Sequence, residues 1–292
     1  YLFFRENIPI DIKVFGSIDL LTLVLFFPNM HFWSASLGKG APIFLGLMMF
    51  TYAVFKPGKR LFLLLLGSAI IYYIRPHVFL FVAVGAVLGY MSGKEKIAFW
   101  KKALVIVSAL GFLFLVQDQI LAVMGVEDTE NLIADLEASS DKKASDLSRS
   151  GSGVDMASYP LPLKLFTFWF RPLFVDAPNI LGIITSFENL VYLLLFLKIL
   201  KKDFFKFLKK SAAPVKMSFV VFFTTSLAMT FVMSNLGLIM RQKSMVMYFI
   251  FFVIYYYLAE KKYEKYVKMK RFQEFQKSKQ EELNNPSQVA MV

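Results

Sequence analysis

Long apolar runs recur along this chain, and they limit its possible folds more than any other feature. Hydrophobic residues make up 57% of the 292 residues. Several runs approach the roughly 20 residues that a helix needs to cross a bilayer, where only helices and closed barrels satisfy every backbone polar group. We therefore predict an all-α, polytopic transmembrane helical bundle. The predicted spans are 17–28, 41–55, 61–74, 77–91, 99–123, 179–200, 215–234 and 244–259.

Several of these predicted spans are short. A helix of about 14 residues covers about 21 Å of a hydrocarbon core that is about 30 Å thick. Such helices must be shielded by neighbours or must border a polar cavity. We assign 1–259 to a transmembrane domain of about eight spans and 260–292 to a basic cytoplasmic tail, whose spacing predicts a helix. Because the chain starts at Tyr1 without a basic leader, we expect further helices of a larger protein to precede it.

Charge predicts the orientation of the bundle, since positively charged connections remain in the cytoplasm. The connections 56–60, 92–102 and 198–216 are strongly basic, as is the tail, so we place all four inside. The segment 126–158 has eight acidic and three basic residues and belongs to a predicted external loop over 124–160. This alternation requires a tight hairpin at Arg75-Pro76, because one 31-residue helix over 61–91 would be about 46 Å long.

Proline also punctuates residues 160–178, so we predict an interfacial or re-entrant element there on the external face. Trp33 and Trp169 then lie at the external interface and Trp100 at the internal one, where amphipathic rings are preferred.

A group of cationic and titratable residues falls on the predicted external side, where the charge rule does not place them. Ionisable groups at membrane depth cost about 2.5–3.5 kcal/mol each and usually line a cavity or bind a ligand. With only Asp176 and Glu188 nearby, the group predicts an anionic ligand such as phosphate or pyrophosphate. Lys39 or Lys243 alone is equally compatible with a cation that reaches lipid headgroups. The group comprises Arg75, Arg171, Arg241, Lys39, Lys243, His31 and His77.

Two of the arginines precede a proline, in Arg75-Pro76 and Arg171-Pro172. Proline disfavours the helical conformation of the residue before it, so each arginine is expected at a helix break. Glu188 lies about halfway along its predicted span. It is either a structural carboxylate that holds helices together, or a counter-charge for an arginine or a proton acceptor.

The motifs "PNMHFWSASLGK", "IRPH", "FRPLF" with "SFENL", and "NLGLIMRQKSM" occur in this order. The ordered set resembles the motifs of bacterial membrane polymerases of the O-antigen and exopolysaccharide type, over roughly residues 20–259. Members of that family transfer a glycan from undecaprenyl pyrophosphate to another lipid-linked unit, outside the bacterial cytoplasmic (inner) membrane. The resemblance implies a metal-independent glycosyltransferase without a cofactor, consistent with the lack of a DxD motif in the sequence. The net charge of +12 is assigned to membrane orientation, not to nucleic acid.

By that resemblance, the partners are a lipid-linked oligosaccharide, membrane lipids and a chain-length regulator. His77 would deprotonate the acceptor hydroxyl, with His31 and Glu188 as alternative bases, and the external loop would act as a lid or glycan guide. The implied catalytic residues are His77, Arg75, Arg171, Arg241 and Glu188, and the implied substrate-binding residues are Lys39, Lys243, His31, Trp33, Trp169, Asn179 and Gln242.

Other function classes use the same residues. Related membrane glycosyltransferases and ligases share the chemistry, and a transporter or flippase for an anionic lipid-linked substrate would need the same basic cavity. A transporter also needs access from both faces, whereas the internal halves of the spans carry no comparable row of charges. In a structural subunit, the cations would only anchor lipid headgroups.

Overall fold

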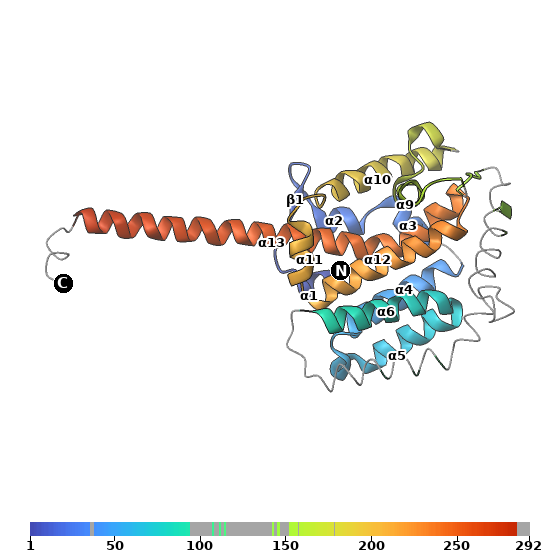
Figure 1. The fold of residues 1–292 in the computed structure, drawn as a ribbon, viewed down its shortest axis with the longest axis horizontal. Coiled ribbons are helices and arrows are strands. Elements are labelled where there is room, and N and C mark those ends of the chain that lie inside the picture. Colours follow the sequence, from blue (N-terminus) through green and yellow to red (C-terminus); the bar gives the residue numbers. More distant parts are fainter. Residues whose placement is uncertain are drawn as a thin grey trace.

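The computed structural model describes residues 1–35, 38–93, 152–156, 158–177 and 179–284, with a few isolated residues between 107 and 146. Within these ranges the chain is a bundle of α-helices with one two-stranded hairpin, which confirms the predicted all-α class (Figure 1). The predicted span 99–123, Trp100 and most of the predicted external loop lie outside the described residues.

The elements follow one another from the N-terminus in short and long pieces. The hairpin pairs Lys13 with Asp19 and Val14 with Ile18, and its turn places Phe15 and Gly16 at positive φ. The bounds are α1 Leu2–Asn7, β1 Lys13–Val14, β2 Ile18–Asp19, α2 Leu20–Leu25, α3 Pro28–Ala35, α4 Gly40–Ala53, α5 Pro57–Ile74, α6 Pro76–Ser92, α9 Leu161–Phe170, the 3₁₀ turn η1 Phe174–Asp176, α10 Ile180–Leu197, α11 Phe204–Lys210, α12 Ala213–Val232 and α13 Leu236–Asn284.

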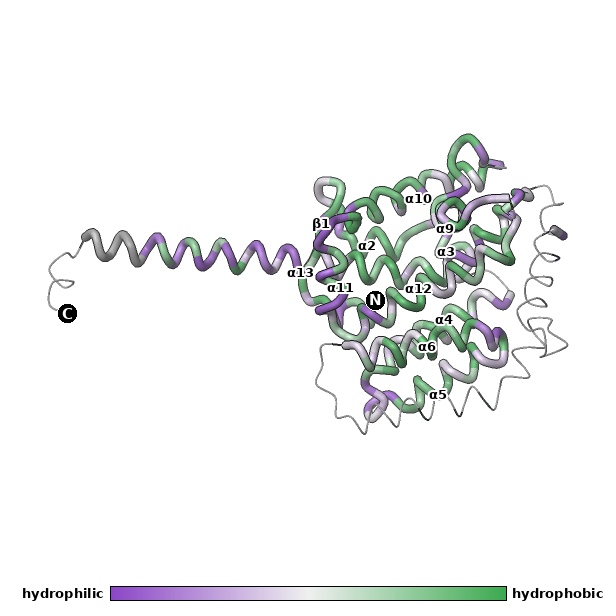
Figure 2. Tube along the Cα trace, in the orientation of Figure 1, coloured by the Kyte–Doolittle hydropathy of each residue, from purple (hydrophilic) through white to green (hydrophobic). Residues whose placement is uncertain are grey.

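Among the described residues, four helices are long and apolar enough to cross a membrane, namely α5, α10, α12 and the first 42 residues of α13. The shorter apolar helices α4, α6 and α9 pack among them. Figure 2 shows apolar residues along the bundle and polar residues at its ends and on the projecting part of α13. The chain is therefore a membrane protein.

Prolines set two of the helix boundaries. Helix α5 ends at Ile74, Arg75 has extended backbone angles, and α6 begins with Pro76, which confirms the predicted hairpin. The predicted span 17–28 is wrong. Asp19 caps the six-residue helix α2 by accepting a 2.8 Å hydrogen bond from the Thr22 N–H, and Pro28 starts a separate helix.

The last predicted span starts too late and ends too early. Helix α13 begins at Leu236 instead of 244 and continues without a break through the predicted tail to Asn284. Beyond Glu260 it projects from the bundle as a single exposed helix (Figure 1). Arg241, Gln242 and Lys243 consequently lie within the first two turns of α13, not in a loop.

Glycines allow two helix pairs to approach closely. Gly85 and Gly89 of α6 face α12, and a Cβ at Gly89 would lie 2.8 Å from the Ala213 carbonyl oxygen. Gly46 of α4 and Gly67 of α5 face each other in the same way. Small residues four apart are a common basis of helix packing in membranes.

Charged residues sort to the two ends of the bundle. At the lysine-rich end, Glu6 is ion-paired with Lys56 and Arg60, and Lys261 lies 2.7 Å from Asp203. Lys216 of α12 also donates to the Ser92 carbonyl at the end of α6. The opposite end, which we call the arginine end, holds the α5–α6 break and the beginning of α13.

Candidate functional site

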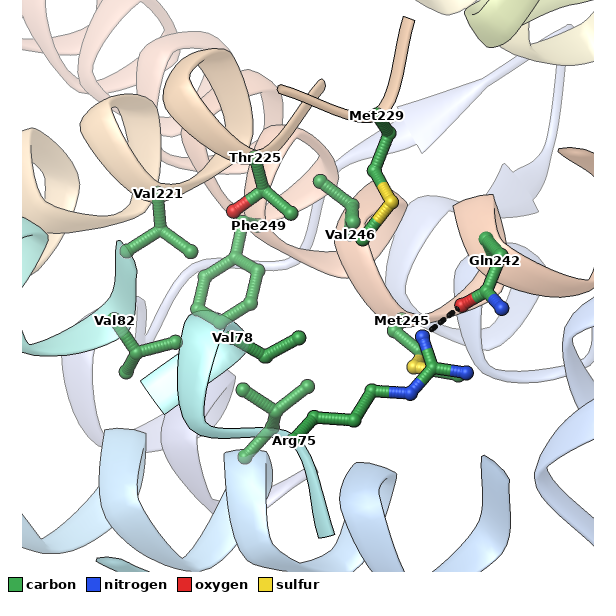
Figure 3. A pocket seen from close by; sticks show the side chains of 11 residues that line it. Arg75, Val78, Val82, Val221, Thr225, Met229, Gln242, Met245, Val246 and Phe249 are labelled. Atoms are coloured by element: carbon green, nitrogen blue, oxygen red, sulfur yellow. Dashed lines mark hydrogen bonds between the residues drawn. The ribbon is translucent and has the colours of Figure 1, made fainter. Parts of the chain in front are cut away.

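Arg75 marks the centre of the arginine end because it forms the break between α5 and α6. Its Nη1 donates a 2.5 Å hydrogen bond to Oε1 of Gln242 on α13. Behind this pair lies a narrow cavity between α6, α12 and α13, lined mainly by apolar side chains (Figure 3). Its volume of about 10 Å³ accommodates about one water molecule. The exposed side of the arginine is therefore the side that a larger ligand can reach.

Arg241 lies one turn into α13 and approaches the same place. Its guanidinium carbon is 5.7 Å from the centre of the Trp33 ring, within the range of a cation–π interaction. A Cβ added at Gly38 would lie 3.3 Å from its Nη2, so the turn before α4 passes close to the guanidinium. Arg75 and Arg241 are near enough for their positive charges to repel each other.

Neither of these two arginines is neutralised by the protein within the described part of the chain. Ion pairs with carboxylates there involve Arg5, Lys56, Arg60, Arg171, Lys261 and Lys270. Two guanidinium groups at one end of the bundle, without an acidic partner among the described residues, create a local preference for an anion.

Trp33 is held in place by a chain of buried polar groups. Its Nε1 donates a 3.0 Å hydrogen bond to Oδ1 of Asn29, and the Asn29 amide donates to the Met240 carbonyl at 3.1 Å. The backbone N–H of Asn29 in turn donates to Glu188 at 2.7 Å. Glu188 also accepts a hydrogen bond from the Tyr192 hydroxyl. A buried carboxylate on α10 thus caps the first turn of α3, the helix that carries Trp33.

Lys243 lies in the protein interior, with no exposed surface. Its Nζ donates to Oδ1 of Asn189 at 2.5 Å and to the carbonyl of Arg171 at 2.9 Å. The amide of Asn189 donates to the carbonyl of Pro172 at 2.7 Å. Both hydrogen bonds of Lys243 therefore end on protein atoms, not at an open surface.

Arg171 follows α9 at a break, as its proline predicted, and the Arg171-Pro172 bond is cis. Unlike Arg75 and Arg241, it has an acidic partner, since its Nε is paired with Asp176. The other oxygen of Asp176 accepts a 2.5 Å hydrogen bond from the Leu173 N–H, which closes the η1 turn. Nη1 of Arg171 also lies 3.5 Å from the Tyr159 hydroxyl.

The remaining predicted site residues occupy varied positions. His77 is half-buried in the first turn of α6, two residues after Arg75, and Lys39 is exposed at the start of α4. His31 is exposed and a ring nitrogen contacts the Leu25 carbonyl. Asn179 caps α10 by accepting a 2.9 Å hydrogen bond from Gly182. Trp169 stacks on Phe222 of α12, which holds its ring within the bundle.

The structure thus brings Arg75, Arg241, Gln242 and Trp33 to one place, with Glu188 and Lys243 in the polar network behind them. Sequence reasoning did not assign a site role to Asn29, Asn189 or Tyr192. Each is a single uncharged polar residue in an apolar setting, so neither charge nor periodicity separates it from its neighbours. The one available signal was proximity, because Asn189 follows Glu188 and Asn29 follows Pro28.

Over the described ranges, no group of three or more His, Asp or Glu residues could hold a metal ion. Comparisons with protein-family models, with curated proteins and with solved structures find no match to this chain. The family resemblance therefore rests on the ordered motifs alone.

Proposed function

We propose that this protein is a membrane glycosyltransferase that polymerises or ligates oligosaccharide units carried on undecaprenyl pyrophosphate, in surface polysaccharide biosynthesis. One observation carries the proposal. Arg75 and Arg241 are far apart in sequence but lie at the same end of the bundle, where Arg75 bonds to Gln242, the residue after Arg241, and neither arginine has a carboxylate partner in the described part of the chain. A diphosphate with a membrane-embedded tail matches both that charge and the location at the end of the spans.

In the proposed reaction, the positive charge of the two arginines stabilises the leaving group. The acceptor hydroxyl attacks the anomeric carbon of the donor sugar, a new glycosidic C–O bond forms, and the bond to the phosphate oxygen breaks. Its electron pair remains on the departing undecaprenyl pyrophosphate, where the two guanidinium groups stabilise the growing negative charge. The hydroxyl proton passes to a base, for which His77 is the leading candidate because it lies two residues after Arg75 and imidazole is the side chain most often used as a general base.

The distribution of charge supports a location of this site outside the bacterial cytoplasmic membrane. The lysine-rich end carries the basic connections and the base of the α13 projection, and such segments remain in the cytoplasm. The arginine end is opposite to it (Figure 1). Its cations are then exceptions to the charge rule, as expected of residues retained for a ligand.

The proposal is tested with the purified protein in liposomes that contain a lipid-linked repeat unit. The parent protein should convert single units into a ladder of longer glycans. Arg75→Gln and Arg241→Gln should each slow this conversion by roughly 100-fold or more, the usual cost of removing a charge-stabilising group. The control is Arg271→Gln, which removes an exposed arginine from the α13 projection and should leave the rate unchanged.

Normal ladders from both arginine variants would refute the proposal. Movement of the lipid-linked unit across the bilayer without growth in its length would refute it as well, and would favour a transporter.

A further inference from the structure

We propose that Lys243 and Asn189 act as positioning residues, which together hold the break that bears Arg171 in its place beside the site. The geometry of this inference comes from contacts between α10, α13 and the segment that follows α9. Its effect on catalysis rests on the proposed function. It removes Lys243 from the residues expected to touch the ligand.

The contacts form a short chain across three helices. Lys243 of α13 donates to Asn189 of α10 at 2.5 Å and to the Arg171 carbonyl at 2.9 Å. Asn189 then donates to the Pro172 carbonyl at 2.7 Å. Two consecutive carbonyls at the break therefore receive one hydrogen bond each from side chains of two other helices. We call Lys243 and Asn189 the strut.

The break needs these donors because it lies where the α-helical ladder has ended. The carbonyls that follow the last turn of α9 have no helical partner. Pro172 has no N–H and prevents the preceding residue from continuing the helix. A buried carbonyl without a hydrogen-bond donor destabilises the fold, and one enclosed by protein cannot be satisfied by water. The strut supplies the hydrogen bonds that this irregular backbone lacks.

The same contacts fix the direction in which Arg171 points. Its carbonyl is held by Lys243 on one side, while its Nε is paired with Asp176 on the other. The backbone and the side chain of one residue are thus both restrained. Glu188 lies next to Asn189 on α10 and restrains α3 through the Asn29 N–H, so adjacent residues of one helix serve two segments of the site.

Full burial separates this role from direct binding. Lys243 has no exposed surface, whereas Arg171 retains 22% of its side-chain exposure despite its ion pair. The exposed part of the Arg171 side chain is open to contact, whereas Lys243 cannot be contacted without displacing protein. The effect of Lys243 on a reaction must therefore pass through the segment that it holds.

The first test needs no ligand. The chain has no cysteine, so a single introduced cysteine can carry a spin label. Val175 is fully exposed on η1, four residues after Arg171, and Val175→Cys provides a reporter of the break. Lys243→Met and Asn189→Leu should each make the spectrum of this label distinctly more mobile. A label at Phe205→Cys on α11, at the lysine-rich end, should not change.

Two further variants guard against a general loss of folding. Thr185→Val removes a buried hydroxyl from α10 that bonds only within its own helix, to the Leu181 carbonyl, and should leave the Val175 label unchanged. Asn189→Asp retains an acceptor for Lys243, but a carboxylate cannot donate to Pro172, so its label should be intermediate. Unchanged mobility in both Lys243→Met and Asn189→Leu would overturn the proposal.

The second test connects the strut to Arg171 by a double-mutant cycle in the liposome assay. Lys243→Met should slow glycan transfer by about 10–100-fold, because small displacements of a positioned group have effects of that size. In an Arg171→Gln background the same change should cost less than about twofold, while in an Arg75→Gln background it should keep its full effect. Equal losses in all three backgrounds would show that Lys243 only stabilises the fold.

The two proposals fail in distinguishable ways. If the labels respond as expected but the parent protein forms no glycan ladder, the proposed function is wrong and the strut remains a device that orders the break. If the ladder forms but neither variant alters the mobility of the label, the positioning role of Lys243 and Asn189 is wrong and the proposed function is unaffected.

Discussion

Gly89→Ala should destabilise this protein, although alanine is ordinarily the better helix former. Gly89 is on the face of α6 that packs against α12. A Cβ there would lie 2.8 Å from three atoms, namely the backbone N and Cβ of Met217 and the carbonyl oxygen of Ala213. Two of the three are backbone atoms of α12, which cannot rotate away. The helices must therefore separate to admit one methyl group.

The size of the effect follows from two opposing terms. Replacing glycine by alanine inside a helix gains about 0.5–1 kcal/mol of intrinsic helix stability. Forcing an extra carbon into a closely packed interface costs about 1–3 kcal/mol, and the rigid contacts at Gly89 place it at the upper end of that range. A net loss of about 2 kcal/mol should lower the unfolding temperature by about 3 °C for a chain of this size.

Gly85, one turn earlier on the same face, offers an internal comparison. A Cβ at Gly85 would lie 2.4 Å from Cγ2 of Val221, but the next atoms are at 3.3 and 3.4 Å. The main obstacle there is a side-chain methyl, so Val221→Ala should relieve Gly85→Ala. The double variant should be more stable than the sum of the two single effects predicts. No comparable rescue is available to Gly89→Ala.

The measurement is thermal unfolding of the purified protein in detergent, followed by tryptophan fluorescence. Gly58→Ala is the matched control, because nothing lies within 4 Å of a Cβ at that position near the start of α5, and it should be neutral or stabilising. If Gly89→Ala unfolds at the same temperature as Gly58→Ala, α6 and α12 are not as closely packed as we describe.

Two other predictions concern the opposite ends of the bundle. The hydrogen bond from Arg60, with help from Lys56, lowers the pKa of Glu6 from its ordinary value of 4.5 to about 2. The ionised Glu6 therefore stabilises the fold fully above pH 4.5, and this contribution is lost as the pH falls toward 2. The unfolding temperatures of the parent and of Glu6→Gln should converge over that pH range. Because the ion pairs of Glu6 are partly exposed, the parent and Glu6→Gln should differ in stability by at most about 1 kcal/mol. A difference in unfolding temperature that persists at low pH would contradict this prediction. At the arginine end, Trp33→Leu should slow glycan transfer by about 2–30-fold through loss of the cation–π contact with Arg241, whereas Trp33→Phe should retain most of the rate. Equal rates in both variants would contradict that role for the ring.

The sequence predicted the fold well where proline or charge determined it. The Arg75-Pro76 break, the separate helices on either side of it and the short α9 follow from the restricted backbone of proline. The prediction of 17–28 as one span was wrong because apolar composition outweighed two local signals, the cap at Asp19 and the proline at 28. Helix α13 starts earlier than the predicted span because the charges of Arg241 and Lys243 favoured a position before the span, while the fold buries Lys243 inside the helix bundle.

The charged members of the candidate site could be predicted from the residues themselves, and Trp33 and Gln242 from the family resemblance, but the buried polar network of Asn29, Asn189 and Tyr192 could not. Arg75, Arg241 and Lys243 stand out in an apolar sequence, but their contacts depend on how α10 and α13 rotate about their axes, which composition does not determine. Lys243 is two residues after Arg241, and this spacing turns it by about 200° on a helix, away from Trp33 and toward Asn189. One residue faces the open end and the other faces the interior, although the sequence treats them alike.

The contrast between the two ends of the bundle gives the proposed site its strongest physical support. Both ends carry several cations, but at the lysine-rich end Glu6 accepts from Lys56 and Arg60, and Asp203 from Lys261. At the arginine end, the carboxylate that forms an ion pair among the described residues is Asp176, and its partner is Arg171. Leaving Arg75 and Arg241 together raises the free energy of the unliganded protein, because like charges repel and desolvation is costly. An anion bound near both guanidinium groups removes this repulsion, which makes its binding more favourable. A diphosphate should therefore bind at the end of the bundle that has unpaired positive charge.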